Sequence, residues 1–495
     1  PRHKDFQSFA LPTELRHQEK ISVTDLRRGT KLDKFRFAAK IAYIFLVKRI
    51  LTYFRSMAIV QQVLFLLTLV VATYFIWRRV SRIKSNIQLG KPSEAAGDTS
   101  QRWKNVLLVA FGQRKMFKRV IPAFLHFWIY AGFIIINLEV LEFVLDGLLG
   151  THRLFAPFLG SFYPLLMNLF ELLAVAVLVA CLFFLVRRNV LKIKRFWSAE
   201  MTSWPRLDGN LILVIEITLM LAILTMNASD QILQSRDEHY TATGSLFFSS
   251  FLMPMLDGLS TSALIGVERF TWWFHIVGIL GFALYVTYSK HLHIFLAFPN
   301  TYYANLEPKG QIKNMPVVTN EVKSMLGLGA VETPAGEPGR FGAKDINDLS
   351  RVNLMAAYAC TECGRCTSEC PANLTGKKLS PRKIMMDTRD RMEEVGESLA
   401  KGGPGLQDGK SLLGDYVSKE EINACTSCNA CVEACPVLIN PLEIILEMRR
   451  YVAMEESGSP AQWNAMFQNI ETSFAPWKFP ASDRFNWANE LKSKS

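Results

Sequence analysis

The chain has 495 residues, of which 50% are hydrophobic and 20% charged, and its formal net charge is +12. This composition excludes a disordered chain, fits a fully soluble protein poorly, and at this length favours two or three domains. Residues 351–495 carry 17 Lys or Arg and 19 Asp or Glu, whereas residues 1–350 carry 39 and 25. Because the basic part is also the apolar part, we expect cationic loops of a membrane protein and no nucleic-acid partner.

The first 55 residues are expected to form a polar and amphipathic N-terminal segment. Within it, Ile41–Phe54 (IAYIFLVKRILTYF) is predicted to be an amphipathic helix lying on one membrane face. The first long apolar run begins only after residue 50, so no signal peptide is expected.

Residues 56–300 are predicted to form a membrane domain with five spans, because about 20 apolar residues cross a bilayer. Core helices of a soluble protein are the alternative, but several runs end in basic clusters such as Arg187-Arg188. Leu246–Met255 is too short to span, is interrupted by Pro254, and is expected to lie at the outer interface. The spans are expected at roughly 57–77, 121–145, 163–186, 209–228 and 269–290.

The orientation follows from the basic residues in the loops. Loops 78–120 and 187–207 carry eleven and six Lys or Arg, whereas loops 146–162 and 229–268 carry one each. We therefore predict a multi-pass protein of the inner (cytoplasmic) membrane, with everything after the fifth span in the cytoplasm. This places the N-terminus outside, although residues 1–55 hold thirteen Lys or Arg and so oppose that placement.

Histidines in or near the spans are candidate haem ligands, because a neutral imidazole binds haem iron. Burial of an ionisable group in a membrane also costs free energy, so such a group is a functional candidate. His126 in the second span and His293 at the end of the fifth are expected at the same inner depth, as the axial ligands of one haem b. If the fifth span is one continuous helix, His275 lies five turns before His293 on the same face, about 27 Å away. His275 is then a ligand of a second haem or part of a quinone site.

Two further residues, Lys290 and His291, lie at the inner boundary of the fifth span. They are candidates for contacts with haem propionates or for proton relay. The alternative for Lys290 is an anchor whose ammonium group reaches the membrane surface.

The segments FLHFWIY and FHIVGILGFALYVTYSKHLHIFLAFP resemble the cytochrome b (gamma) subunit of respiratory nitrate reductase over residues 55–300. The resemblance implies two b haems held by two histidines on the second span and two on the fifth. His126, His275 and His293 match three of these ligands, and the fourth position is occupied by Ile136. One haem is therefore expected, and a second would need another ligand.

Residues 301–350 are rich in Gly, Pro and polar residues and are predicted to be a linker. The stretch Gly327–Gly342 contains GLG, but no strand precedes it and no GxGxxG follows, so a nucleotide-binding loop is not expected.

Eight of the nine cysteines form two copies of C-x2-C-x2-C-x3-C-P, the spacing of bacterial [4Fe–4S] ferredoxins, between Cys360 and Cys435. In this arrangement the fourth Cys of each copy binds the other cluster. Structural zinc is the alternative, but it does not need the third closely spaced Cys or the Pro. The first cluster is expected on Cys360, Cys363, Cys366 and Cys435, and the second on Cys370, Cys425, Cys428 and Cys431.

The interval between the two Cys runs includes a predicted helix, Ser380–Glu397, and a Gly-rich turn, Lys401–Gly405. With this helical insert, residues 350–490 resemble the C-type subunit of heterodisulfide reductase and the iron–sulfur subunits of succinate dehydrogenase. We expect a mostly α-helical two-cluster domain at 351–440 and a partner-docking tail at 441–495. The fusion with a cytochrome b part resembles membrane iron–sulfur oxidoreductases, which implies a cytoplasmic cysteine-rich (CCG-type) or flavoprotein redox partner.

The fold class predicted overall is an all-α membrane protein, a five-helix transmembrane bundle followed by a cytoplasmic two-cluster ferredoxin domain. The sequence contains no Cys-Cys-Gly motif, P-loop or nucleophile elbow, so the soluble substrate is expected to react on a partner. The predicted function is an electron-transfer subunit of a membrane quinone oxidoreductase. The alternatives are a non-enzymatic wiring or assembly subunit of a larger respiratory complex, and a quinol-oxidising branch of a sulfur or disulfide reductase.

Overall fold

The computed structural model describes residues 31–93, 97–329, 340–403 and 408–493, with the backbone alone for residues 31–58. Within these ranges the secondary structure is helical, with no strand and two isolated β-bridges. The chain divides into two compact units, Pro1–Thr68 with Val144–His152, and Leu69–Phe143 with Arg153–Ser495. In the first unit the buried Phe65 ring lies against Gly147, where an added Cβ would come within 2.6 Å of the ring.

Five helices are long and apolar enough to cross a membrane. Together with the iron–sulfur domain described below, they confirm the predicted fold class. They are Ile59–Gln88 within α2 (Lys31–Gln88), α4 (Val120–Leu149), Phe162–Val190 formed by α6 (Phe162–Leu185) and η4 (Val186–Val190), α7 (Ser203–Leu233) and α9 (Thr261–Val286).

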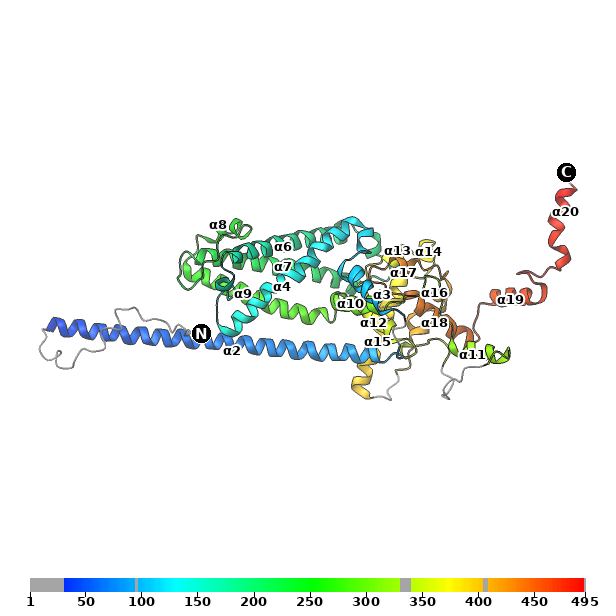
Figure 1. The fold of residues 1–495 in the computed structure, drawn as a ribbon, viewed down its shortest axis with the longest axis horizontal. Helices are drawn as coiled ribbons and strands as arrows, with labels where there is room; N and C mark the ends of the chain where they lie inside the picture. Colours follow the sequence, from blue (N-terminus) through cyan, green and yellow to red (C-terminus); the bar gives the residue numbers. More distant parts are fainter. Residues whose placement is uncertain (1–30, 94–96, 330–339, 404–407, 494–495) are drawn as a thin grey trace. The chain divides into compact units, whose positions relative to one another are not determined.

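Helices α6, α7 and α9 lie side by side in the second unit, and the 120–143 part of α4 packs against α6 (Figure 1). Glycines allow these close approaches. A Cβ added at Gly132 of α4 would lie 2.6 Å from Val177, and one at Gly278 of α9 would lie 2.6 Å from Leu219. Apolar side chains such as Leu165 and Leu221 remain exposed, as expected of faces that lipid covers.

The fifth span ends earlier than predicted, at Val286 instead of residue 290. Ser289 is extended and its hydroxyl caps the short helix η7 (Lys290–Leu292), while the Asp208 carboxylate accepts the Lys290 backbone N–H at 3.2 Å. His293 therefore begins a separate helix, α10 (His293–Tyr302). The expectation that His275 and His293 share one face of a single helix is wrong, because the chain turns between them.

The N-terminal expectation also changes. The backbone of Ile41–Phe54 is part of α2 and continuous with the first span, so it is not a separate helix. Residues 1–30, the remainder of the polar segment, lie outside the described residues. The predicted interfacial piece Leu246–Met255 contains two short helices, η6 (Ser249–Phe251) and α8 (Met253–Leu256), and its Phe251 and Met255 side chains are exposed.

The C-terminal part of the second unit packs around a core of fully buried side chains such as Leu354, Ile384 and Ile445. The predicted helix Ser380–Glu397 is α15, whose N-terminus is capped by the Ser380 hydroxyl. The helices of this part are α11 (Pro316–Met325), η8 (Ile346–Asp348), α12 (Arg351–Ala359), α13 (Arg365–Ser368), α14 (Pro371–Leu374), α15 (Pro381–Gly402), η9 (Leu412–Tyr416), α16 (Lys419–Asn423), α17 (Ala430–Ala434), α18 (Pro441–Met454), α19 (Ala461–Ser473), η10 (Ala481–Phe485) and α20 (Asn486–Lys492).

The linker expected at 301–350 is not entirely a loop, because it contains α11 and η8. Part of the predicted loop Gly327–Gly342, residues 330–339, lies outside the described residues, as do residues 404–407 after α15. Short helices also connect the spans: α3 (Thr99–Asn105), η2 (Val106–Phe111), η3 (Met116–Lys118), α5 (Ala156–Leu159) and η5 (Lys194–Phe196).

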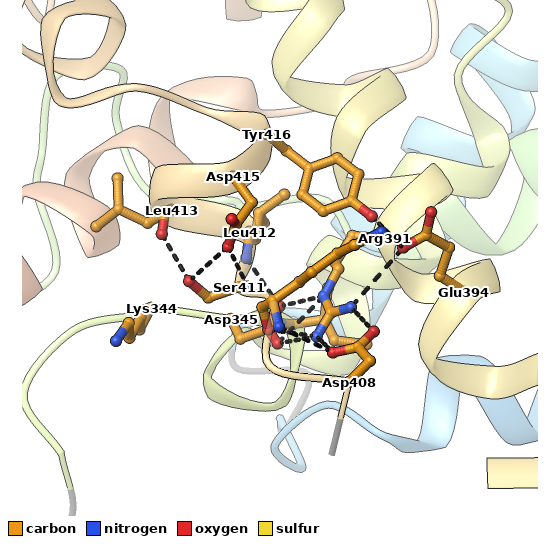
Figure 2. A network of polar contacts seen from close by, with 12 residues as sticks. Lys344, Asp345, Arg391, Glu394, Asp408, Ser411, Leu412, Leu413, Asp415 and Tyr416 are labelled. Carbon is orange, nitrogen blue, oxygen red and sulfur yellow. Dashed lines mark hydrogen bonds and ion pairs between the residues drawn. The ribbon is translucent and has the colours of Figure 1, made fainter. Parts of the chain in front are cut away.

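A buried arginine on α15 holds the two segments that flank this helix (Figure 2). The Arg391 guanidinium binds the Asp345 carboxylate at 2.8 Å, the Asp408 carboxylate, and the Lys410 carbonyl at 2.7 Å. Asp345 also accepts the backbone N–H of Leu412 at 3.1 Å. These contacts attach the end of the linker and the segment after α15 to the same helix.

Candidate metal centres

The first candidate centre is a small cavity lined by Cys360, Cys363, Cys366 and Cys435. Cys360 and Cys363 lie in the loop between α12 and α13, Cys366 lies in α13, and Cys435 follows α17. The structure therefore brings together the four residues that the spacing assigned to the first cluster, including the one from the second motif. We call this set the cluster-one site.

The second candidate centre combines Cys370, which precedes α14, with Cys425, Cys428 and Cys431 around α17. Cys370 is close enough to Cys425 and Cys431 for their charges to interact. Cys366 likewise interacts with Cys431, so the two sets of thiols are neighbours. We call the second set the cluster-two site.

The two Cys runs have the same backbone geometry. Glu362 and Ser427 stand two residues after the first Cys of each run, with φ of 53° and 54°. Gly364 and Asn429 stand four residues after it, with φ of 70° and 60°. Left-handed residues at matching places curl each loop so that its thiols point inward, and Gly and Asn are the types that tolerate this conformation.

The thiols have the properties of ligands that need a cation. Burial raises the pKa of Cys360 and Cys431 to about 12 and that of Cys435 to about 11. Neighbouring thiolates add to these shifts for all three, so a bound cation would be needed to hold four of them ionised in one place. Among the described residues, no three Cys, His, Asp or Glu side chains converge on a single ion. A cubane differs from such a site, since each thiolate binds its own iron.

The cluster-one loop is bound to residues at the ends of α7 and α9 that lie nearest the iron–sulfur domain. Glu362, buried in this loop, receives Lys290 Nζ at 2.7 Å and the Arg389 guanidinium at 2.8 Å. These two cations lower the pKa of Glu362 despite its burial, so its carboxylate is charged. Lys290 is thus buried and ion-paired, and the alternative of a surface-reaching anchor is wrong because Glu362 and the Pro205 carbonyl occupy its ammonium group.

A second buried pair fixes the same loop from the other side. Arg382 of α15 has a side chain that is 1% exposed and binds the Glu200 carboxylate at 2.6 Å. It also donates to the Arg195 carbonyl at 2.6 Å and to the Glu362 carbonyl at 3.4 Å. The cluster-one loop is therefore held by the loop between the third and fourth spans.

The predicted haem pair also comes together. The ring centroids of His126 and His293 are 6.4 Å apart. Two imidazoles on one iron, with about 2 Å from iron to nitrogen and about 1 Å from nitrogen to centroid on each side, give about 6 Å. Nδ1 of His126 is 3.1 Å from Gln113 Oε1, and Nδ1 of His293 is 3.2 Å from the Lys290 carbonyl.

Because both of these partners are acceptors, each Nδ1 carries the proton and each Nε2 keeps its lone pair for a metal. Burial lowers the pKa of His293 to about 4 and that of His291 well below its usual value, so both rings are neutral. His291 lies between Phe282 and His293, with ring centroids 5.6 and 5.2 Å away. The residues present therefore fit one b-type haem.

His275 is in a different situation. Its side chain is 1% exposed, its Nδ1 donates to the Leu219 carbonyl at 3.0 Å, and its Nε2 is buried with no hydrogen-bond partner. Such an atom calls for a ligand. Ile136, the position where the nitrate reductase pattern has its fourth histidine, is buried and cannot ligate. A second bis-histidine haem is not supported there.

A cavity of about 1150 Å³ lies between the start of α7, the segment after α9, and α15. Charged side chains line much of it, including Arg79, Lys290, Glu362 and Glu393. An apolar quinone ring prefers an apolar lining, so this cavity is a poor quinone site.

Three functional features were not foreseen. Gln113 orients His126 from a left-handed position with φ of 48°, and nothing in its sequence context marks it. Arg79 follows the predicted end of the first span at residue 77, but it lies within the observed helix Ile59–Gln88, is buried, and binds Glu393 of α15 at 2.6 Å. Glu362 could have been suspected, because it is a charged residue inside a Cys run.

Residues 359–439 match the family model of a 4Fe-4S dicluster domain. They are an iron–sulfur domain for two clusters, which agrees with the two Cys runs and the two thiol sites.

Two relatives that match over more of the chain are named as oxidoreductases. A probable iron-sulfur-binding oxidoreductase, FadF of Bacillus subtilis, is 27% identical over 457 residues, 86% of this chain and 61% of the relative. An EtfAB:quinone oxidoreductase of Syntrophomonas wolfei is 26% identical over 422 residues, 79% and 54% of the two chains. This chain therefore spans less than two thirds of either relative.

A shorter match joins the chain to a probable membrane-anchored ferredoxin of Chromohalobacter salexigens. The two are 32% identical over 166 residues, 30% of this chain and 24% of the relative. No solved structure matches the chain.

Proposed function

We propose that this chain is the electron-transfer subunit of a membrane quinone oxidoreductase. It carries electrons between a cytoplasmic redox partner and the quinone pool, by way of two [4Fe–4S] clusters and one haem b. The clusters and the haem, when bound, supply one-electron carriers. The protein's own residues hold these groups close together and tie the iron–sulfur domain to the membrane helices.

The observation that carries this proposal is the proximity of the cluster-one site to the histidine pair. The Arg365 guanidinium, next to Cys366, is close enough to His126 for their charges to interact. Asn300 of α10, the helix that begins at His293, donates to the Val437 carbonyl at 2.6 Å, two residues after Cys435. The same short helix thus contacts the cluster-one site and carries a haem ligand.

We propose His275 as part of the quinone site, with a second haem as the rival occupant. The support is its buried Nε2, which has the hydrogen-bonding capacity to meet a quinone oxygen. The Phe143 and Trp272 rings lie nearby, with the Phe143 centroid 6.0 Å from that of His275, and they offer the apolar surroundings that a quinone ring prefers.

The proposed location is the inner membrane, with residues 291–495 in the cytoplasm. The support is the uneven distribution of Lys and Arg between the loops. The cytoplasmic partner is proposed to be a cysteine-rich (CCG-type) protein or a flavoprotein, as in the resemblance to membrane iron–sulfur oxidoreductases. The name of one relative, EtfAB:quinone oxidoreductase, is in keeping with a flavoprotein donor and a quinone acceptor.

The test is the cofactor content and optical spectrum of the purified chain. We expect about eight non-haem irons with matching acid-labile sulfide and one low-spin b haem per chain. His126→Ala and His293→Ala should each abolish the haem spectrum and leave the iron–sulfur content intact. His239→Ala is the control, because His239 is an exposed histidine bound to Asp237.

Other outcomes favour the alternatives. Intact clusters without haem would favour a wiring or assembly subunit and contradict the proposal. Quinol-dependent reduction of the haem distinguishes a quinone-reactive chain from that subunit. A co-purifying sulfur or disulfide reductase would favour the quinol-oxidising branch.

A further inference from the structure

The eight cluster ligands differ in their access to solvent. Cys428 is exposed, whereas Cys360, Cys370 and Cys431 are buried and the other four are intermediate. Cys428 belongs to the cluster-two site, which therefore has the most accessible ligand. The loop of the cluster-one site is instead bound to Lys290 through Glu362. An electron carrier that approaches from the aqueous side thus meets the cluster-two site first.

Basic side chains gather beside this ligand. Lys118 and Lys309 both pair with Glu433 of α17, and their side chains are 58% and 62% exposed. Lys115 donates to the Val432 carbonyl at 3.5 Å and is close enough to both lysines for their charges to interact. Two ammonium groups thus pair with one carboxylate and a third lies close to both, which leaves a net positive rim.

This rim reaches the Cys428 loop itself. Gly310, next to Lys309, lies against the Asn429 side chain, and Asn429 follows Cys428. On the other side, Arg449 donates to the Ser427 hydroxyl at 3.4 Å and to the Cys425 carbonyl. Cationic groups therefore stand on two sides of the exposed ligand.

An exposed apolar side chain also follows another ligand of the cluster-two site. Leu374 is 70% exposed at the end of α14, the one-turn helix that begins after Cys370. Cys370 and Cys428 share the cluster-two site. An exposed apolar residue with a charged rim is the usual anatomy of a protein interface.

We propose that this face, made of Cys428, Leu374, Lys115, Lys118, Lys309 and Arg449, is the docking site for an electron-carrying protein with an acidic rim around its own redox centre. This inference rests on the proposed function and adds the place and the chemistry of the partner. Opposite charges would steer the partner's redox centre towards Cys428 and raise the rate of encounter. The basic rim would reject carriers with a positive rim.

The competing explanation is that the lysines only balance the negative charge of a bound cluster. In that case their reversal would shift a reduction potential but would not change which probes approach the surface. The two explanations are separated by probes of opposite charge, because a potential shift affects the driving force of both probes in the same direction.

The first experiment measures approach without electron transfer. Anionic and neutral dysprosium chelates are added to the reduced, full-length protein in detergent, and the broadening of each cluster's EPR signal is recorded. We expect the anionic chelate to broaden the cluster-two signal, the one lost in Cys428→Ser, more than the cluster-one signal. Lys118→Glu with Lys309→Glu should remove the preference for the anionic chelate.

The second experiment measures rates by stopped flow. Ferricyanide or hexaammineruthenium(III) takes one electron from a reduced cluster, with no bond made or broken. At low ionic strength the double reversal should slow ferricyanide about tenfold and speed the cationic oxidant, and high salt should abolish both effects. Lys118→Gln with Lys309→Gln should give intermediate rates. Lys323→Glu with Lys401→Glu, two exposed lysines elsewhere, is the charge-matched control.

The outcomes separate this inference from the proposed function. Absence of two cluster signals in the wild-type chain would overturn the proposed function itself. Two intact clusters, with equal broadening by both chelates and unchanged rates in the reversed variant, would overturn the docking site alone. Equal effects of the control pair would overturn it as well.

Discussion

Two buried arginines, one among the membrane helices and one in the iron–sulfur domain, show how differently the two regions use charge. Arg153 belongs to the loop after α4, has φ of 56°, and turns inward to bind Asp230 at 3.1 Å, Asn227 at 2.7 Å and Glu139 at 3.4 Å. Arg382 binds Glu200 beside the cluster-one loop. Arg153 joins helices to each other, whereas Arg382 holds a loop that presents metal ligands.

The buried ion pair of Arg153 is therefore structural, whereas that of Arg382 also positions a loop that carries metal ligands. Glu139, Asp230 and Arg153 are each nearly inaccessible, and Arg153 is the only basic residue in loop 146–162. In a span, carboxylates without a cation or a proton are costly, so the loop supplies the cation. In the iron–sulfur domain, the same kind of ion pair holds a loop whose cysteine thiols would bind iron.

The largest expected effect is the loss of a whole cluster from the iron–sulfur domain. Cys435→Ala should remove the cluster-one EPR signal and Cys370→Ala the cluster-two signal, although each residue lies in the other Cys run. The reason is that the fourth thiol comes from the neighbouring motif. Cys181→Ala, a buried cysteine of α6 far from both runs in sequence, is the control and should keep both signals. Loss of the opposite signal would refute the crosswise assignment.

The next effect is on stability. Arg153→Met and Arg382→Met should each lower the free energy of unfolding by about 3 to 5 kcal/mol, because each leaves a buried carboxylate without its cation. Denaturant unfolding in detergent measures this loss. Only Arg382→Met should also alter the cluster-one EPR line shape. If Arg153→Met altered it too, the two regions would not differ as we state.

A smaller effect concerns the two matching left-handed positions. Asn429→Ala should cost about 1 kcal/mol, because a non-Gly residue other than Asn resists this conformation. Gly364→Ala should cost more, since its added Cβ would lie 2.5 Å from the Arg382 guanidinium. Asn429→Gly should be nearly neutral. Equal costs of the two Ala variants, measured by denaturant unfolding, would show that Arg382 moves aside freely.

The smallest effect is expected at an exposed ion pair on α15. Lys401 and Glu397 form an i,i+4 contact at 2.6 Å with both side chains more than half exposed. Such pairs are screened by solvent. Lys401→Ala should leave the unfolding midpoint and both cluster signals unchanged, which sets the baseline for the buried arginines.

The spans, the two thiol sets and the histidine pair could be predicted from composition and residue spacing. The long apolar runs predicted the spans, and α4 and α6 begin at Val120 and Phe162, each within one residue of the predicted starts at 121 and 163. The repeated Cys spacing, through its chemistry, predicted the two thiol sets that the structure brings together, with Cys370 and Cys435 exchanged between the motifs. The depth of His126 and His293 likewise predicted that their rings would meet.

The end of the fifth span and the roles of Lys290 and Arg153 could not be predicted, because they depend on contacts between segments that are distant in the sequence. After Val286 the Ser289 hydroxyl caps the next short helix, and Asp208, from another helix, accepts the Lys290 backbone N–H; the second contact cannot be predicted from the local sequence. The Lys290 side chain pairs with Glu362 across a long sequence separation, so its role could not be read from the boundary of a span. From the sequence, Arg153 is a cation in a loop between spans. In the structure it is buried, because it forms ion pairs with buried carboxylates on α4 and α7.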